Sequence, residues 1–330
     1  MSADPAPRGV RRVLLTGWFS FLHGEATAGD VLAAEAVQQA LETAGIPCDT
    51  AWSPVFRPDA LHLDATDPTC YSHLVFACGP VHARRPAPGI PSPLLALHLR
   101  FAAVRRIAVG VSVEDPGDPA VTGFHRILPR DGPSVERPAV DLAARVPPVD
   151  RVPLVGVVLA AEQHEYGERR RHGRTAEALG DWLRGLDAAR VPMDTRLDTR
   201  DWRLPATPGQ LHSLLARLDV VLTTRLHGLV LALRAGVPAL AVDPVRGGAK
   251  VTAQARALGW PAVLQSELAV PSELGHWWDW CLSEDGLSRA RAVRVRLLRA
   301  AEAPLLDSLL DELLGELQDD LPYDLRDESV

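Results

Sequence analysis

The stretch DVVLTTRLHGLVLALRAGVPALAVDP, residues 219–244, decides the fold. Its opening apolar run predicts a buried strand over residues 219–223, and the apolar spacing that follows predicts a helix from about Arg225. Gly236 and Pro238 end that helix, and residues 238–242 begin a second buried strand. A strand, a helix and another apolar strand without a hairpin turn are typical of a parallel sheet covered by helices.

The same alternation extends along the rest of the chain. Further strands are predicted over residues 13–16, 74–77, 107–111, 154–160 and 191–195. Further helices are predicted over residues 30–44, near Leu94, over 174–186, over 208–217 and from about Ala249. The sequence therefore predicts an α/β protein.

Residues 145–153 interrupt this alternation. They contain three prolines, which break both helices and central strands, so a linker is expected there. A chain of 330 residues also exceeds what one core usually organises. We therefore predict two Rossmann-like domains, residues 1–146 and 147–330, in a GT-B-like arrangement with the active site in the cleft between them.

Composition limits the class of partner. The net charge of −7 disfavours nucleic acid, and the balance of 47% hydrophobic and 23% charged residues is that of a globular protein. The four cysteines lack the spacing of a metal or redox motif, which favours reduced thiols. The apolar run after the N-terminal arginines is too short for secretion or a membrane span. A cytoplasmic location is the expectation.

Three C-terminal patterns have a structural interpretation. Core packing or contact with a second copy explains the leucine stripe, which makes a homodimer an option; its members are Leu305, Leu306, Leu309, Leu310, Leu313, Leu314 and Leu317. The basic run from Arg289 to Arg299 predicts a solvated helix face. The three tryptophans of the preceding segment are expected to pack their helix against the core rather than to stack on a sugar ring; they are Trp277, Trp278 and Trp280.

The chemistry is expected at the start of the helix near Arg225. Thr223 or Thr224 can cap this helix, and Arg225 and His227 lie in its first turn, where free N–H groups and the helix dipole favour an anion. Gly228 leaves room for close approach. The alternative is structural: Arg225 would make an ion pair and His227 would bond a neighbouring loop.

This segment resembles the C-terminal signature of the polysaccharide pyruvyl transferase family. The similarity rests on Thr224-Arg225-Leu226-His227-Gly228, on Ala235-Gly236-Val237-Pro238, on Asp243-Pro244 and on Lys250-Val251. Weaker similarities follow the chain at Gly17-Trp18-Phe19, at Gly29-Asp30, at Cys78-Gly79-Pro80 and at Arg130-Asp131 with Ser134.

The resemblance implies transfer of a pyruvyl group from phosphoenolpyruvate to two hydroxyls of a saccharide, with phosphoenolpyruvate as co-substrate and no cofactor. Arg225, Leu226 and Gly228, with Arg130 from the other domain, would bind the donor anion. His227 would be the general acid or base. Asp30 would act as a base or orient the acceptor, or would only stabilise its helix N-terminus. Acceptor-side loop residues would be Gly17, Trp18, His23 and Gly29.

Other interpretations stay open. Gly248 and Lys250 form either a second anion cradle or a surface turn. Glu165, Glu168 and the nearby histidines have no closed ligand geometry, so no metal is predicted. A GT-B-type glycosyltransferase using a nucleotide-sugar is an alternative, although no paired-glutamate ribose motif is seen. A non-catalytic, anion-binding homologue is another, because residues 26–28 replace the family's usual asparagine.

Overall fold

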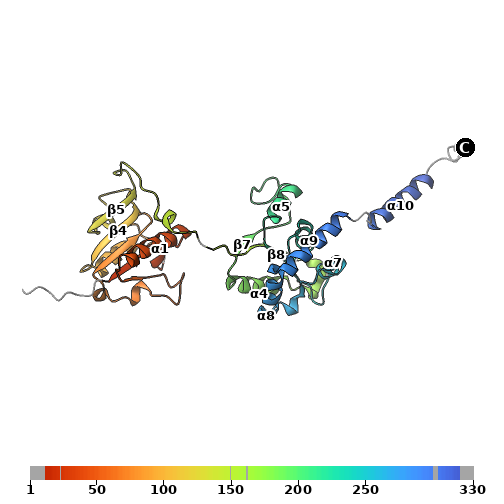
Figure 1. Cartoon of the computed structure of the whole chain (residues 1–330), viewed down its shortest axis with the longest axis horizontal. Helices are drawn as coiled ribbons and strands as arrows, with labels where there is room; N and C mark the ends of the chain where they lie inside the picture. Colours follow the sequence, from red (N-terminus) through yellow and green to blue (C-terminus); the bar gives the residue numbers. More distant parts are fainter. Residues whose placement is uncertain (1–11, 23, 149, 161–162, 300–303, 320–330) are drawn as a thin grey trace, which may run out of the picture. The chain divides into compact units, whose positions relative to one another are not determined.

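The computed structural model describes residues 12–22, 24–148, 150–160, 163–299 and 304–319. The chain forms two compact units, residues 1–149 and residues 150–330, here called the N-terminal and C-terminal domains (Figure 1). Their boundary lies inside the predicted linker, three residues beyond the predicted division after residue 146. Residues 146–148 and 150–153 carry no regular structure, as their prolines dictate.

The N-terminal domain is built on five parallel strands in the order β2-β1-β3-β4-β5. Leu14 lies opposite Asp49 of one neighbouring strand and Leu74 of the other. The strands are β1 (Val13–Thr16), β2 (Cys48–Thr50), β3 (His73–Ala77), β4 (Arg105–Ser112) and β5 (Arg126–Asp131).

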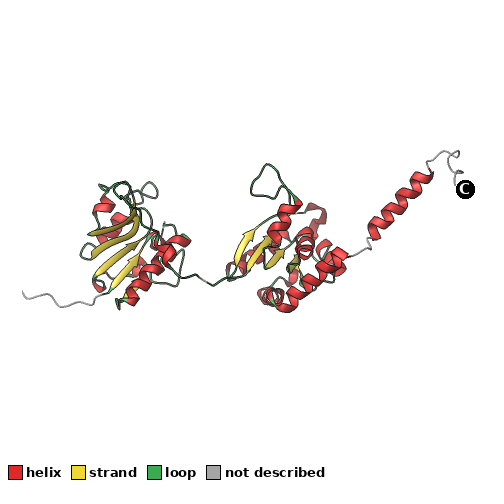
Figure 2. Ribbon diagram, turned by 45° about the horizontal axis from the view of Figure 1, so that its top comes forward, coloured by secondary structure: helices red, strands yellow, loops and turns green. Residues whose placement is uncertain are grey.

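Helices cover both faces of this sheet (Figure 2). Side chains alternate between the faces of a strand. Leu14 accordingly packs with Leu94 and Phe101 on one face, whereas Leu15 packs with Ala34 on the other. The helices are α1 (Ala28–Thr43), α2 (Pro93–Arg100) and α3 (Pro119–Thr122), and short 3₁₀ turns cover Trp18–Ser20, Leu63–Ala65, Pro68–Cys70 and Leu142–Arg145.

The C-terminal domain repeats this topology. Its parallel strands lie in the order β10-β9-β8-β6-β7, so in both domains the chain order across the sheet is second, first, third, fourth, fifth. This is a doubly wound order, and two Rossmann-like α/β domains are confirmed. The strands are β6 (Leu154–Val158), β7 (Ala189–Pro192), β8 (Val220–Thr223), β9 (Ala239–Asp243) and β10 (Val263–Gln265).

A single hydrophobic cluster holds the C-terminal domain together. Strands β8 and β9 are buried along their whole length, as expected of central strands in a covered parallel sheet. The helices are α4 (His172–Arg184), α5 (Pro208–Leu215), α6 (Leu226–Ala235), α7 (Lys250–Leu258), α8 (Pro271–Leu282), α9 (Glu284–Arg299) and α10 (Pro304–Asp319), with 3₁₀ turns at His164–Arg169 and Ser266–Leu268.

Several predictions about the C-terminal helices can be compared with the structure. Trp278 is buried, and Trp277 and Trp280 pack against the same core, so the packing interpretation is confirmed. The prediction that the basic run forms a solvated face is wrong in part. Arg296 donates a hydrogen bond to the carbonyl of Leu258, the last residue of α7, and Arg289 donates one to Gly259, its C-cap. The leucines of α10 from Leu305 to Leu314 are exposed, so core packing does not explain them. A dimer contact stays a prediction, and the side chain of Leu317 lies outside the described residues.

Among the described residues, no helix combines the length and the apolar character needed to cross a bilayer.

Candidate functional site

The candidate site is a pocket at the carboxyl edge of the C-terminal sheet. Its volume is about 320 Å³, and the loops after four of the strands line it. Ala160 and Gln163 follow β6, Thr195 follows β7, Thr224 to His227 follow β8, and Lys250 follows β9. The chain leaves β6 toward β7 on one side and returns to β8 on the other, so this is the switch point where doubly wound sheets bind ligands.

Two threonines fix the loop between β8 and α6. The Thr223 hydroxyl donates to Val158 O at 3.0 Å and accepts from the backbone N–H of Arg225 at 3.0 Å. The Thr224 hydroxyl accepts from the N–H of Ala160 at 2.7 Å. Neither threonine caps α6, contrary to the prediction, because the Thr223 hydroxyl bonds Val158 and Arg225 and the Thr224 hydroxyl bonds Ala160.

The first turn of α6 therefore keeps its backbone donors. Arg225 occupies the N-cap position, and within the described chain no side chain accepts from the N–H groups that follow it. These amides belong to residues 226–228, and two of those residues, Leu226 and His227, line the pocket. A helix start with unsatisfied N–H groups attracts an anion.

Gly228 packs tightly against strand β8. It is buried, and a Cβ built at this position would lie 2.1 Å from the Thr223 hydroxyl. The close approach that the missing side chain of Gly228 permits is therefore to Thr223 of strand β8. Its part in binding the donor through its backbone N–H stays a prediction.

Arg225 combines the structural and the functional interpretations. Its Nη1 makes an ion pair with Asp194 at 3.0 Å and lies 3.4 Å from the Thr195 hydroxyl. Its Nε is buried without a hydrogen-bond partner, and no described residue bonds Nη2. The ion pair thus holds the guanidinium in place at the pocket and leaves Nη2 available to an anion, whereas the buried Nε is out of reach.

His227 and Lys250 supply the other titratable groups of the pocket. The His227 side chain is exposed and makes no hydrogen bond with any described residue, so the structural alternative of a bonded loop histidine is not what is found. The Lys250 ammonium lies 3.9 Å from Glu165 and 5.7 Å from the centre of the Tyr166 ring. One pocket therefore brings together residues up to 25 positions apart in sequence, namely Arg225, Leu226, His227 and Lys250.

The predicted cradle around Gly248 is filled by the protein itself. The buried Asp243 carboxylate accepts from Ala249 N at 2.7 Å, from Val245 N at 3.1 Å, and from the backbone and hydroxyl of Thr252, both at 2.9 Å. The N–H of Gly248 donates to Val245 O. Gly248 is thus a turn residue with a φ of 81° and does not line the pocket, although the loop it shapes begins α7 at Lys250.

The residues predicted in the N-terminal domain lie around the carboxyl edge of its own sheet. Asp30 accepts from the backbone and hydroxyl of Thr27, so it forms a capping box at the start of α1, where Gly29 also lies. The Trp18 indole donates to Pro80 O at 2.8 Å. Gly17 is buried beside Ala77, and His23 lies outside the described residues. Their roles toward an acceptor stay predictions.

Arg130 is already bonded on all three guanidinium nitrogens. It donates to Asp131, to Asp141 and to the Ser112 hydroxyl. The Cys78 thiol faces the same Asp141, and burial raises its pKa, so it stays protonated near neutral pH. Arg130 therefore has a structural role in the N-terminal domain, and its predicted contact with the donor stays a prediction.

Asp194, Thr195 and Gln163 are site residues that the sequence analysis missed. Residues 191–195 were expected to be strand, but β7 ends at Pro192, which places Asp194 and Thr195 in the loop at the sheet edge. A proline at the end of an apolar run was the signal for that earlier end. Gln163 lies in the loop after β6, also at the sheet edge, and belongs to no recognisable sequence motif.

A family model matches residues 183–244, the segment that holds Asp194, Thr195 and the Thr224-to-Gly228 string. It is the model of the polysaccharide pyruvyl transferases. The resemblance seen in the sequence is confirmed over this segment. No curated protein matches the chain.

The solved structures that resemble the chain over nearly its whole length include glycosyltransferases. The glycotransferase of kitacinnamycin is 13% identical with a TM-score of 0.33, covering 93% of this chain and 99% of that one. Spinosyn rhamnosyltransferase SpnG is 12% identical with a TM-score of 0.35, covering 91% and 100%. SnogD from Streptomyces nogalater is 14% identical with a TM-score of 0.33, covering 93% and 100%. TM-scores this low bear on neither activity nor domain arrangement.

Within the described ranges, no group of three or more His, Cys, Asp or Glu side chains could hold a metal ion.

Proposed function

We propose that the chain transfers a pyruvyl group from phosphoenolpyruvate to two hydroxyls of a saccharide or glycosylated small molecule, leaving a cyclic ketal and inorganic phosphate. The observation that carries this proposal is the meeting of Arg225, His227 and Lys250 in one pocket, at a helix start inside or beside the family-matched segment.

The pocket suits the charges of the donor. Phosphoenolpyruvate carries a phosphate and a carboxylate, which both need charge-assisted donors. Arg225 Nη2, the ammonium of Lys250 and the amides at the start of α6 provide them. Asp194 lowers the net positive charge but fixes the guanidinium, which reduces the cost of ordering it on binding.

The reaction also needs a group that moves protons. The methylene carbon of phosphoenolpyruvate gains a proton, and the positive charge that develops on the neighbouring carbon is attacked by the first acceptor hydroxyl, which loses its proton. Inorganic phosphate then leaves with the electrons of its C–O bond. The second hydroxyl adds to the same carbon and loses its proton, which closes the ketal; of the two hydroxyl protons released, one balances the proton gained by the methylene carbon and the other is taken up by the phosphate. His227 is exposed, unbonded and in the pocket, and we assign it one of these proton transfers.

Calorimetric titration of the full chain with phosphoenolpyruvate tests the proposal. We expect saturable binding, and Arg225→Ala should weaken it about 10- to 100-fold, the value of one or two hydrogen bonds to a charged group. Arg234→Ala is the matched control, because Arg234 is exposed in the last turn of the same helix. Tight binding of a uridine nucleotide-sugar without binding of phosphoenolpyruvate would instead support a glycosyltransferase.

A further inference from the structure

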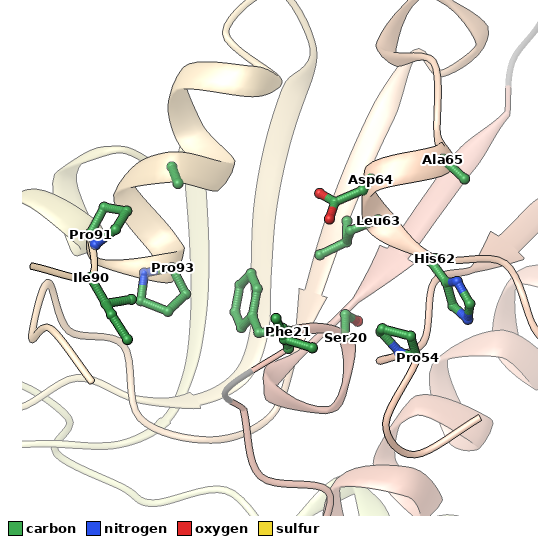
Figure 3. Close-up of a pocket in the computed structure, with 12 residues that line it drawn as sticks. Ser20, Phe21, Pro54, His62, Leu63, Asp64, Ala65, Ile90, Pro91 and Pro93 are labelled. Carbon is green, nitrogen blue, oxygen red and sulfur yellow. The ribbon is translucent and has the colours of Figure 1, made fainter. Parts of the chain in front are cut away.

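The N-terminal domain contains a second pocket at the carboxyl edge of its own sheet. Its volume is about 490 Å³, within the range of small-molecule sites. The segments after β1, β2 and β3 contribute Ser20 to Leu22, Pro54, and Ile90, Pro91 and Pro93, and the turn at Leu63–Ala65 completes the lining. Figure 3 shows Ile90 and Pro93 on one side of Phe21, with Leu63 and Asp64 on the other.

The pocket is lined mainly by apolar groups. Some of them face solvent, and exposing apolar surface to water is unfavourable in free energy. Leu22 is 57% exposed, and Ile90 and Leu63 are only partly buried. Exposed aliphatic side chains gathered around a hollow, rather than scattered, indicate a surface that a ligand covers.

The polar groups of the pocket are largely taken up by the protein. The Ser20 hydroxyl donates to Ala51 O at 2.6 Å and accepts from Gly17 N at 3.0 Å. The His62 ring bonds Arg57 O through Nε2 at 3.0 Å. Asp64 remains, with a fully exposed carboxylate 3.8 Å from Arg100.

This distribution discriminates between ligand classes. A bare sugar would bury several hydroxyls where few partners are free, and each unpaired hydroxyl costs about 1–3 kcal/mol. An apolar ring system needs no such partners and gains from leaving water. A hydroxyl beside the ring could still donate to Asp64 at the rim.

We propose that this pocket, called the ring pocket, binds the apolar ring portion of the acceptor, so that the acceptor is a glycosylated small molecule rather than a polysaccharide. The assignment of that ring to an acceptor rests on the proposed function, whereas binding of the ring itself does not.

The test uses two glycosides with the same sugar, 4-methylumbelliferyl β-D-galactoside and methyl β-D-galactoside, titrated into the full chain. We expect the ring-bearing glycoside to bind at least tenfold more tightly. Ala96→Trp fills the pocket from an exposed position on α2 and should abolish that preference. Leu99→Trp adds the same side chain at an 80% exposed position outside the pocket and should preserve it.

A second variant, Ile90→Ser, covers the case in which Ala96→Trp does not fold. It makes the pocket more polar and should also reduce the preference for the ring-bearing glycoside. Equal binding of the two glycosides, or a preference that survives both pocket variants, would overturn the ring pocket. Failure of phosphoenolpyruvate to bind while the ring preference persists would overturn the proposed function and leave the ring pocket intact.

Discussion

At the scale of single residues, Gly228 and Thr223 show how tightly the site is joined to the sheet. Thr223 is fully buried, and its hydroxyl bonds both β6 and the start of α6. Gly228, the third residue of α6, lies against it with no space for a side chain between them. The position of Arg225 therefore depends on a residue that does not line the pocket.

Gly228→Ala should destabilise the C-terminal domain by about 1–3 kcal/mol, because the new Cβ would overlap the Thr223 hydroxyl. Gly275→Ala, in α8, is the matched control: nothing lies within 4 Å of its Cβ position, so helix propensity alone should stabilise the domain by about 0.5–1 kcal/mol. Denaturant unfolding measures both changes. Shifts of the same sign would contradict the packing described here.

At the scale of elements, the loop between β9 and α7 is organised by one carboxylate. Asp243 is fully buried at the end of β9, and its oxygens bond residues two, six and nine positions later. Those bonds start α7 at Lys250, so the lysine reaches the pocket because of a carboxylate that does not line it.

Asp243→Ala should cost at least about 3 kcal/mol, since several buried donors lose their acceptor together. It should also weaken phosphoenolpyruvate binding by releasing Lys250. Thr252→Val removes the hydroxyl bond to Asp243 but leaves the backbone bonds, and about 1 kcal/mol is expected. Unfolding and calorimetry check the pair. An Asp243→Ala variant with unchanged stability would contradict the role given to this carboxylate.

The elements also show what sequence could and could not predict. The central strands were predicted because β8 and β9 are apolar up to their last residue, and α6 because its apolar spacing is helical. Three outer strands, β2, β5 and β10, were missed because they are short or polar, and β5 contains Pro129. Arg225 and His227 were found through their motif. Asp194 acts through an ion pair with Arg225, a contact distant in sequence that no local pattern encodes. Asp243 belongs to the motif, but its bonds to the backbone of the following loop do not show in the sequence.

At the scale of the whole molecule, two domains with the same strand order carry different chemistry at the same edge. The C-terminal domain presents cationic groups and free amides at its switch point. The N-terminal domain presents an apolar pocket and a cationic residue, Arg130, that is bonded on every nitrogen. We therefore assign the anion to the C-terminal domain and an apolar ring to the N-terminal one.

The most direct test of the central claim is hydrogen–deuterium exchange of the full chain with and without saturating phosphoenolpyruvate. The amides of residues 226–228 have no side-chain cap, so they should exchange quickly in the free protein and at least tenfold more slowly when an anion accepts from them. Arg225→Ala should lose this protection. Protection confined to the N-terminal domain, or none at the start of α6 when binding is saturated, would contradict the assignment of phosphoenolpyruvate to this site.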